Sequence, residues 1–369
     1  MRTRITYILS NINKALAFEW ITDYLDKNKF ELSFILLNSG ESFLERYLQT
    51  KNVRIWRIPY RGKKNLPKAI TKIYQILKQE NTQLVHCHLF DACIAGLTAA
   101  KLAGIKKRIY TRHHATFHQV YFPRAVWYDK FISAMATDIV AISENVRQTL
   151  INEGVKAEKI HTIHHGFKLI DFQNTSSNQI QILKQKYNTQ GKYPIIGVIS
   201  RYFELKGIQY VIPAFQKLLN SYPESLLILA NATGNYASDI KHLLKQLPQI
   251  NYVEITFEPE IFALYQLFDI FIHVPIDPTL EAFGQTYVEA LAAGIPSVFT
   301  LSGVSGEFVQ HEKNALVVPF KDSEAIYESI LKILENRDLK NRLIAEGKKD
   351  VNKFFELQQM IMKLEQMYE

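Results

Sequence analysis

The stretch YPIIGVISRYFELKGIQYVIPAFQKLLNSYPESLLILA, residues 193–230, contains one complete strand–helix–strand unit. Apolar runs at 193–200 and 225–230 predict two buried strands, and segment 207–220 between them has apolar residues at helical spacing. Two strands connected through a helix run parallel, with the helix packed on one face of their sheet. This stretch therefore predicts an α/β fold with a parallel sheet.

The same alternation extends over most of the chain. Further strands are expected at 5–9, 30–37, 53–58, 83–88, 107–112, 138–143 and 159–164, and then at 252–256, 269–274, 297–300 and 315–319. A polar Asn/Ser/Gln-rich segment interrupts the alternation at 171–192, and the tail from 322 to 369 has a helical pattern throughout. We therefore expect two doubly wound, Rossmann-like domains, 1–170 and 193–352, joined by a linker at 171–192. Ligands of open α/β sheets bind beyond the carboxyl ends of the strands, so a cleft between two such domains is the expected active site.

Composition narrows the class of protein. The chain has 369 residues, of which 47% are hydrophobic and 22% charged, as in ordinary globular proteins with packed cores. No run approaches the ~18 apolar residues of a membrane-spanning helix, and the short basic start is not typical of a signal peptide. Cys87 and Cys93 lack a CxxC spacing, so we expect buried reduced thiols. These features predict a cytoplasmic protein.

The charge is distributed unevenly. Residues 1–170 carry 26 Lys and Arg against 13 Asp and Glu, whereas the chain as a whole has a net charge of +8. No acidic residue interrupts the stretch from Arg54 to Lys78. This basic stretch favours contact with anionic lipid headgroups or a phosphorylated acceptor, and the alternative is a solvated helix face. We expect no nucleic-acid partner.

A second feature of the first half favours a membrane surface. Four aromatic residues surround Arg124 after the predicted strand 107–112: Phe117, Tyr121, Phe122 and Trp127. Aromatic rings beside cations suit the interfacial zone of a bilayer, whereas the alternative places the rings in the core. A peripheral position on the inner face of the membrane is therefore a further expectation.

Two carboxylates eight residues apart mark the second domain. Glu281 follows the predicted strand 269–274, and Glu289 lies about one turn inside the next helix. Gly284 removes a side chain where that helix begins, and the free N–H groups of Gln285 and Thr286 suit a diphosphate. A carboxylate beside such a site can accept hydrogen bonds from sugar hydroxyls. Alternatively, both glutamates only stabilise the helix electrostatically.

Cations and histidines follow other strands. Arg201 and Lys206 lie in the loop after strand 193–200, where a guanidinium and an ammonium suit phosphate oxygens. His113 and His114 end strand 107–112, and their side chains point to opposite faces. No HxH, HExxH or DxD spacing completes a metal site. One histidine facing the cleft as a hydrogen-bond or acid–base partner is the favoured interpretation, and a structural role is favoured for His164 and His165.

The run EAFGQTYVEALAAGIPSVFT (281–300) resembles the motif of glycosyltransferase family 4. Members of this family are retaining enzymes of the GT-B fold that use nucleotide-diphosphate sugars. GVISRYFELKGIQYVIPAFQKLL, DIVAISENVRQTLINEGV, HHGF and GEFVQHEKNALVV are similar to other segments of the family, in the same order. The resemblance covers nearly the whole chain. It implies two Rossmann-like domains facing across a cleft, with the final helix, about 353–369, crossing back to the first domain.

The resemblance also implies roles for the candidate residues. Arg201 and Lys206 match the pair that neutralises the donor diphosphate, and Glu281 matches the carboxylate that contacts the transferred sugar. Glu289 matches the carboxylate that holds the ribose hydroxyls. Gly284, Gln285 and Thr286 match the phosphate-facing turn, and His113 matches a cleft histidine near the reacting sugar. The first domain would bind the acceptor and the second the nucleotide sugar.

The expected activity is transfer, with retention, of a sugar from a nucleotide-diphosphate donor to a saccharide or lipid-linked saccharide in the synthesis of a cell-surface polysaccharide or glycolipid. No cofactor or metal is expected, because protein cations fill that role. The chain departs from the family at the glycine-free loop Asn11–Asn13, at Ala230-Asn231-Ala232, and at His165, where the family has Asn. A GT-B-shaped binding protein without turnover and a sugar-nucleotide epimerase remain as alternatives. A dehydrogenase lacks support, because no GxGxxG follows strand 5–9 or 193–200.

Overall fold

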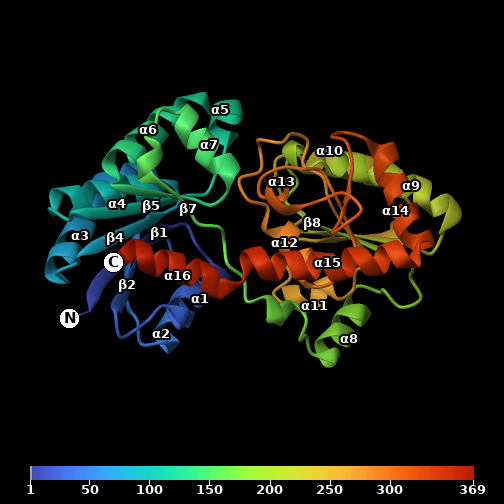
Figure 1. Ribbon diagram of the computed structural model, residues 1–369, viewed down its shortest axis with the longest axis horizontal. Coiled ribbons are helices and arrows are strands. Elements are labelled where there is room, and N and C mark those ends of the chain that lie inside the picture. The colour runs from blue at the N-terminus through green and yellow to red at the C-terminus, as the bar shows by residue number, and fades with distance from the viewer. Residues whose placement is uncertain (1) are drawn as a thin grey trace. The chain divides into compact units, whose positions relative to one another are not determined.

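The computed structural model of the chain describes residues 2–369. It consists of two compact units (Figure 1). Unit 1 contains the residues up to Phe167 together with Leu357–Glu369, and unit 2 contains Lys168–Glu356.

Unit 1 is built on a seven-stranded parallel sheet in the order β3-β2-β1-β4-β5-β6-β7. Its strands are β1 (Thr3–Ser10), β2 (Phe30–Asn38), β3 (Arg54–Pro59), β4 (Leu84–His88), β5 (Lys107–Arg112), β6 (Asp138–Ala141) and β7 (Ile160–Thr162). Its α-helices are α1 (Leu16–Tyr24), α2 (Phe43–Thr50), α3 (Leu66–Gln79), α4 (Phe90–Leu102), α5 (Phe117–Tyr121), α6 (Val126–Met135), α7 (Glu144–Asn152) and α16 (Leu357–Tyr368).

The central strands of this sheet are buried on both faces. Ile5 of β1 pairs with Leu32 of β2 on one side and with Leu84 of β4 on the other. Phe34 and Ile35 of β2 are fully buried although neighbouring side chains on a strand point to opposite faces. Helices must therefore cover both faces, as a parallel sheet requires.

Unit 2 has a six-stranded parallel sheet in the order β10-β9-β8-β11-β12-β13. Its strands are β8 (Ile195–Ile199), β9 (Leu226–Ala230), β10 (Tyr252–Ile255), β11 (Ile270–His273), β12 (Ser297–Phe299) and β13 (Leu316–Val317). Its α-helices are α8 (Ser177–Lys186), α9 (Ile208–Ser221), α10 (Ala237–Leu244), α11 (Ile261–Tyr265), α12 (Gln285–Ala292), α13 (Ser305–Phe308), α14 (Ser323–Glu335) and α15 (Arg337–Phe355). The predicted α/β class with two parallel sheets is confirmed.

The segment expected as a linker, 171–192, lies within unit 2 and contains helix α8. Leu183 of α8 is buried, and Lys186 forms an ion pair with the buried carboxylate of Glu258 at 2.7 Å. The polar composition of this segment did not predict a helix, because only a narrow apolar stripe of α8 packs against the rest of unit 2.

The last helix, α16, belongs to unit 1, as expected. The Tyr368 hydroxyl is hydrogen-bonded to the Tyr7 hydroxyl and lies 2.7 Å from Nδ1 of His86. Gly166 lies against α16, where a Cβ atom would come within 2.7 Å of Met360 and 2.9 Å of the Leu357 backbone. A larger residue at 166 would therefore push the helix away.

Asparagine takes the place of glycine in two loops that depart from the family. Asn11 has a φ of +51° and Asn231 a φ of +61°. Asparagine tolerates this left-handed backbone better than most residues. The Asn38 side chain also donates to the Ile12 carbonyl at 2.7 Å and accepts from its N–H at 3.1 Å, which fixes the first loop. The loops therefore keep a turn without the glycines.

Within residues 2–369, no helix combines the length and apolar character needed to cross a bilayer.

Candidate active site

The carboxyl end of β8 leads into the loop that carries both predicted cations. Arg201 is exposed, with its guanidinium carbon 4.6 Å from the centre of the Phe203 ring. Lys206 ends this loop, and Gly207 follows with a φ of +74°. A Cβ atom on Gly207 would lie 1.8 Å from the Val274 carbonyl oxygen. The loop therefore reaches its position beside β11 only with glycine there.

Lys206 and Glu281 form the closest charged pair of the predicted site. Nζ of Lys206 lies 2.5 Å from Oε2 of Glu281, and both side chains are largely buried. Burial raises the pKa of Glu281, but the Lys206 ammonium and the neighbouring His273 together outweigh that effect and hold the pKa well below its usual range. Glu281 is thus ionised at neutral pH. This pairing does not match the interpretation in which Glu281 only stabilises the helix.

Helix α12 begins beside this pair. Gly284 precedes it with a φ of +83°, and a Cβ atom there would come within 2.5 Å of the Tyr287 ring. Gln285 and Thr286 are the first residues of the helix, so their N–H groups have no carbonyl partner inside it. The buried Oγ1 of Thr286 also lacks a hydrogen-bond partner within the described chain. These donors suit an anion.

Glu289 lies on the same helix and has a different partner. The Tyr265 hydroxyl donates to Oε2 of Glu289 at 2.7 Å. Burial raises the pKa of Glu289 to about 7, and the Tyr265 hydrogen bond opposes the increase. The two carboxylates of the motif therefore differ in protonation: Glu281 is ionised, and Glu289 is close to half-protonated at neutral pH.

Three polar residues of this region were not predicted. His273 ends β11 behind Glu281, Tyr265 holds Glu289, and Ser200 follows β8 with a buried Oγ that has no partner in residues 2–369. The position of His273 and Ser200 at the carboxyl ends of strands was the available signal. No sequence signal pointed to Tyr265, because its partner Glu289 is 24 residues away in the sequence.

In unit 1, His113 follows β5 and lines a cavity of about 230 Å³ together with Leu89, Phe90 and Phe117. Its Nε2 lies 3.1 Å from Nδ1 of His88, and its ring stacks on that of His165 at 5.6 Å. Burial and neighbouring histidines hold the pKa of His113 well below its usual range, so the ring is neutral. A neutral ring suits a hydrogen-bonding role.

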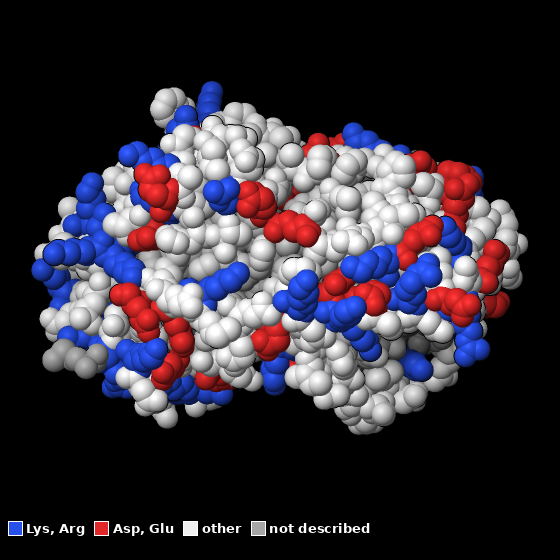
Figure 2. Space-filling view, in the orientation of Figure 1, with Lys and Arg blue, Asp and Glu red and all other residues white. Residues whose placement is uncertain are grey.

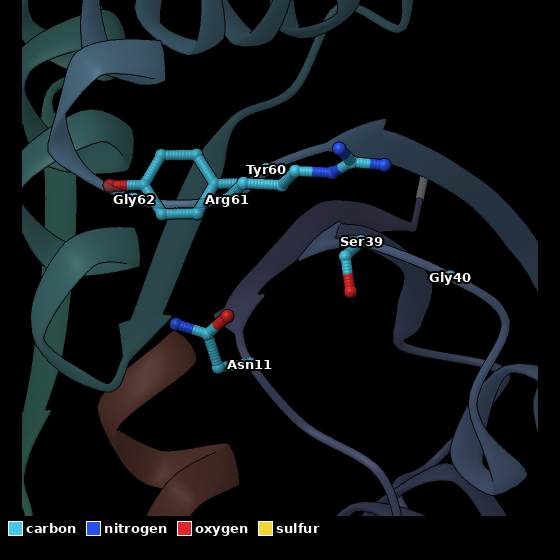
Figure 3. A pocket seen from close by; sticks show the side chains of 6 residues that line it. All are labelled: Asn11, Ser39, Gly40, Tyr60, Arg61 and Gly62. Carbon is cyan, nitrogen blue, oxygen red and sulfur yellow. The ribbon is translucent and has the colours of Figure 1, made fainter.

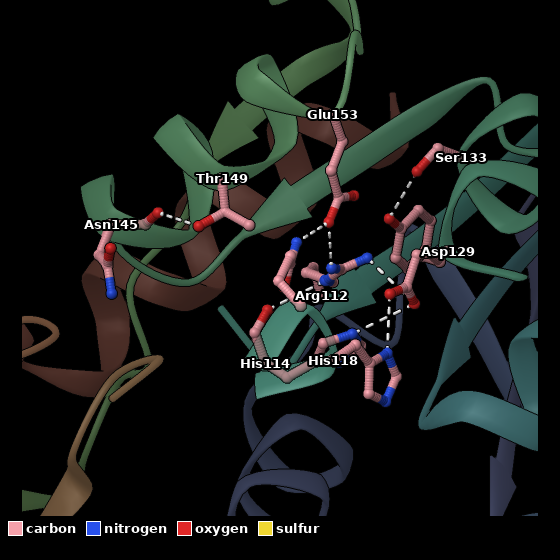
Figure 4. Close-up of polar contacts among 10 residues, drawn as sticks. Arg112, His114, His118, Asp129, Ser133, Asn145, Thr149 and Glu153 are labelled. Atoms are coloured by element: carbon pink, nitrogen blue, oxygen red, sulfur yellow. Dashed lines mark hydrogen bonds and ion pairs between the residues drawn. The ribbon is translucent and has the colours of Figure 1, made fainter. Parts of the chain in front are cut away.

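His114 joins a buried polar cluster (Figure 4). Arg112, His114 and His118 all point to the carboxylate of Asp129, at 3.2, 3.2 and 2.7 Å. His114, His118 and Asp129 are close enough to hold a metal ion. However, Arg112 already neutralises the carboxylate, which weakens its attraction for a second cation. The expected absence of a metal stays a prediction.

A second hollow of unit 1 lies beyond the carboxyl ends of β1, β2 and β3 (Figure 3). Its volume is about 510 Å³, and its lining residues are Asn11, Ser39, Gly40, Tyr60, Arg61 and Gly62. The polar lining and its place at the carboxyl edge suit a polar ligand.

The two sheets and the strand-end residues define a class, the two-domain proteins of the GT-B fold. Solved structures agree with this fold. A glycosyltransferase from Rickettsia africae superimposes with a TM-score of 0.82 at 21% identity, over 100% of this chain and 98% of that one. Anabaena Alr3699/HepE, solved with UDP and glucose, gives a TM-score of 0.82 at 19% identity, with 98% of each chain covered.

Family models then specify the family. The model described as Glycosyltransferase Family 4 matches residues 21–169, and the model described as Glycosyl transferases group 1 matches residues 179–350. The chain therefore belongs to glycosyltransferase family 4, as its motifs indicated, and it is a glycosyltransferase.

Curated relatives include enzymes of capsule and glycolipid synthesis. CapM of Staphylococcus aureus, a capsular polysaccharide biosynthesis glycosyltransferase, is 26% identical over 310 residues, covering 82% of this chain and 80% of CapM. An alpha-monoglucosyldiacylglycerol synthase from Acholeplasma laidlawii is 25% identical, covering 65% of this chain and 54% of that enzyme.

Proposed function

We propose that the protein is a retaining glycosyltransferase that moves a sugar from a nucleotide-diphosphate donor to a saccharide or lipid-linked saccharide acceptor. The observation that carries this proposal is the Lys206–Glu281 pair beside the first N–H groups of α12. It combines a cation and helix donors for a diphosphate with a carboxylate for sugar hydroxyls. Structural neighbours that bind UDP or UDP-glucose support the donor class.

The chemistry follows from the charges. In this proposal Arg201, Lys206 and the start of α12 stabilise the negative charge that develops on the leaving diphosphate, without a metal. Glu281 orients the transferred sugar, and Glu289 accepts hydrogen bonds from the ribose. His113 contributes a hydrogen bond to the reacting sugar. In this proposal the acceptor attacks on the face that the diphosphate leaves, and a phosphate oxygen accepts the acceptor proton, while a double displacement through a covalent glycosyl-enzyme is the alternative route to retention.

A panel of sugar nucleotides tests the activity. Thermal-shift measurements identify the base and sugar that stabilise the protein, because a ligand at 100 times its Kd adds about 2.7 kcal/mol. The selected donor is then incubated with saccharide and lipid-linked acceptors, and NMR gives the anomeric configuration of the product. Binding without hydrolysis or transfer would indicate a binding protein, and conversion to an epimer would indicate an epimerase.

We also propose that unit 1 meets an anionic membrane at the cytoplasmic face. The support is an aromatic patch on α5, α6 and the turn between them, with exposed side chains of Tyr121, Phe122, Trp127, Tyr128 and Phe131, and the exposed Val120 beside them. Nζ of Lys63, from the basic stretch, lies 4.4 Å from the centre of the Tyr128 ring, so cations adjoin the patch. Lys and Arg side chains also gather over α3 (Figure 2).

Co-sedimentation with vesicles tests this second proposal. Each Lys or Arg near an anionic surface contributes roughly 1 kcal/mol, so binding to anionic vesicles should weaken as salt is added. Failure of the protein to co-sediment with either anionic or neutral vesicles at low salt would exclude the membrane proposal.

A further inference from the structure

A buried histidine without a hydrogen-bond partner lies behind the Lys206–Glu281 pair. His273 is 3% exposed, and neither ring nitrogen has a partner within residues 2–369. Its ring packs edge-on against Tyr287 of α12, with the centroids 4.7 Å apart. An unpaired buried polar group destabilises the folded state, and native proteins contain few of them. Packing alone would be served better by an apolar side chain, so the imidazole calls for a functional explanation.

Two potential hydrogen-bond donors, Lys206 and His273, lie near the same carboxylate oxygen of Glu281. Nε2 of His273 lies 3.7 Å from Oε2 of Glu281, the same oxygen that lies 2.5 Å from Lys206 Nζ. A distance of 3.7 Å is too long for a hydrogen bond, and closing it to about 2.9 Å requires a shift of about 0.8 Å. Burial lowers the pKa of His273, so its ring is neutral and can carry its one proton on Nε2.

We propose that His273 is a positioning residue, which donates from Nε2 to Glu281 when the donor diphosphate draws Lys206 away. This inference rests on the proposed function, because it takes the diphosphate as the ligand of Lys206. Without a replacement, the departure of Lys206 would take the ammonium partner from the largely buried Glu281 carboxylate, which is strongly unfavourable for a charge in a buried site. The exchange keeps Glu281 ionised and oriented toward the sugar while Lys206 moves to the phosphate.

The exchange can be tested first without any ligand. Lys206→Met removes the ammonium, so His273 should form the hydrogen bond with Glu281. In ¹⁵N-histidine-labelled protein, a slowly exchanging, hydrogen-bonded Nε2 proton should then appear in Lys206→Met and be absent from the wild type and from Lys206→Met/His273→Gln. Failure of this resonance to appear in folded Lys206→Met protein would overturn the inference. This arm remains decisive if no nucleotide binds, an outcome that would contradict only the proposed function.

The second test uses a double-mutant cycle with nucleotides. The base is chosen from UDP, GDP and ADP by thermal shift of the wild type, and affinities are measured for its diphosphate and monophosphate. His273→Leu should weaken diphosphate binding about tenfold and leave the monophosphate unaffected, because only the diphosphate draws Lys206. The loss should disappear in a Lys206→Met background, whereas a purely structural role would give additive losses that also affect the monophosphate.

Two further variants complete the cycle. His273→Gln retains an N–H donor and should restore part of the diphosphate affinity. His242→Leu, on the exposed side of α10, is the matched control and should bind both nucleotides as the wild type does. Equal diphosphate binding by His273→Leu and His242→Leu would contradict the inference.

Discussion

The hydroxyl of Tyr265 donates a hydrogen bond to Oε2 of Glu289 at 2.7 Å, so a residue of α11 orients the second carboxylate of the motif. This bond favours the ionised form of Glu289 against the effect of burial, which raises its pKa to about 7. Because the pKa of Glu289 is close to neutral pH, loss of this one hydrogen bond would reduce the fraction of Glu289 that is ionised.

Tyr265→Phe should therefore raise the pKa of Glu289 above 7. If the ionised carboxylate accepts the ribose hydroxyls, donor binding at pH 7 should weaken about fivefold to tenfold and recover as the pH rises to 8.5. Isothermal titration calorimetry with the donor nucleotide between pH 7 and pH 8.5 measures the change in affinity. Tyr252→Phe removes a surface hydroxyl of unit 2 and is the control. A parallel loss in both variants, or a loss independent of pH, would contradict the role of Tyr265.

Glu289 should also make the stability of the ligand-free protein depend on pH. Its pKa rises from 4.5 unfolded to about 7 folded, so its contribution is present below pH 4.5 and is lost as the pH rises through 7. Glu289→Gln removes this loss and should be more stable than the wild type at pH 8 by about 1–3 kcal/mol. Urea unfolding at pH 5 and pH 8 measures the difference, and an equal difference at both pH values would count against the assignment.

Lys206→Ala should lower turnover about a hundredfold or more, because the variant loses a charge that stabilises the leaving diphosphate. Initial rates of sugar transfer at saturating donor provide the measurement. Lys217→Ala breaks an exposed ion pair with Glu324 elsewhere in unit 2 and should keep the wild-type rate. Turnover of Lys206→Ala at the rate of Lys217→Ala would remove Lys206 from the site.

Asp129→Asn should destabilise unit 1 by about 3 kcal/mol, because the fully buried Arg112 would lose part of its compensation. Chemical denaturation followed by tryptophan fluorescence reports the loss, because the buried Trp20 of unit 1 becomes exposed on unfolding. Asp138→Asn affects a partly exposed pair with His161 and should cost less than 1 kcal/mol. Stabilisation of the wild type by zinc that is lost in Asp129→Asn would instead favour a metal in this cluster.

Trp127→Ser should weaken binding to anionic vesicles about tenfold if the aromatic patch enters the interface. Trp127 is 77% exposed, so its removal should leave the folding stability unchanged. Ile250→Ser, at a 71% exposed position of unit 2, is the control. Co-sedimentation at low salt compares the three proteins, and equal binding by all of them would exclude the patch as the contact.

The sequence by itself determined the two parallel sheets and the family, because both depend on local patterns. Apolar runs of strand length alternate with helical spacing, and the motif from Glu281 to Glu289 is contiguous in the chain. The sequence also has Gly207 and Gly284 at two predicted strand-to-helix junctions, and the structure shows both in a left-handed backbone conformation that glycine adopts without strain.

Only the tertiary structure decided which of these residues meet. Lys206 and Glu281 are 75 residues apart, and their ion pair depends on the neighbouring positions of β8 and β11 in the sheet. No local pattern indicates the position of His273 at 3.7 Å from Glu281, the hydrogen bond from Tyr265 to Glu289, or the three donors around Asp129. Each depends on burial and on distances of a few ångströms between separate elements, which the packing of the whole unit sets. The sequence did not predict helix α8 for the same reason. Its stability comes from a small buried face rather than from its polar composition.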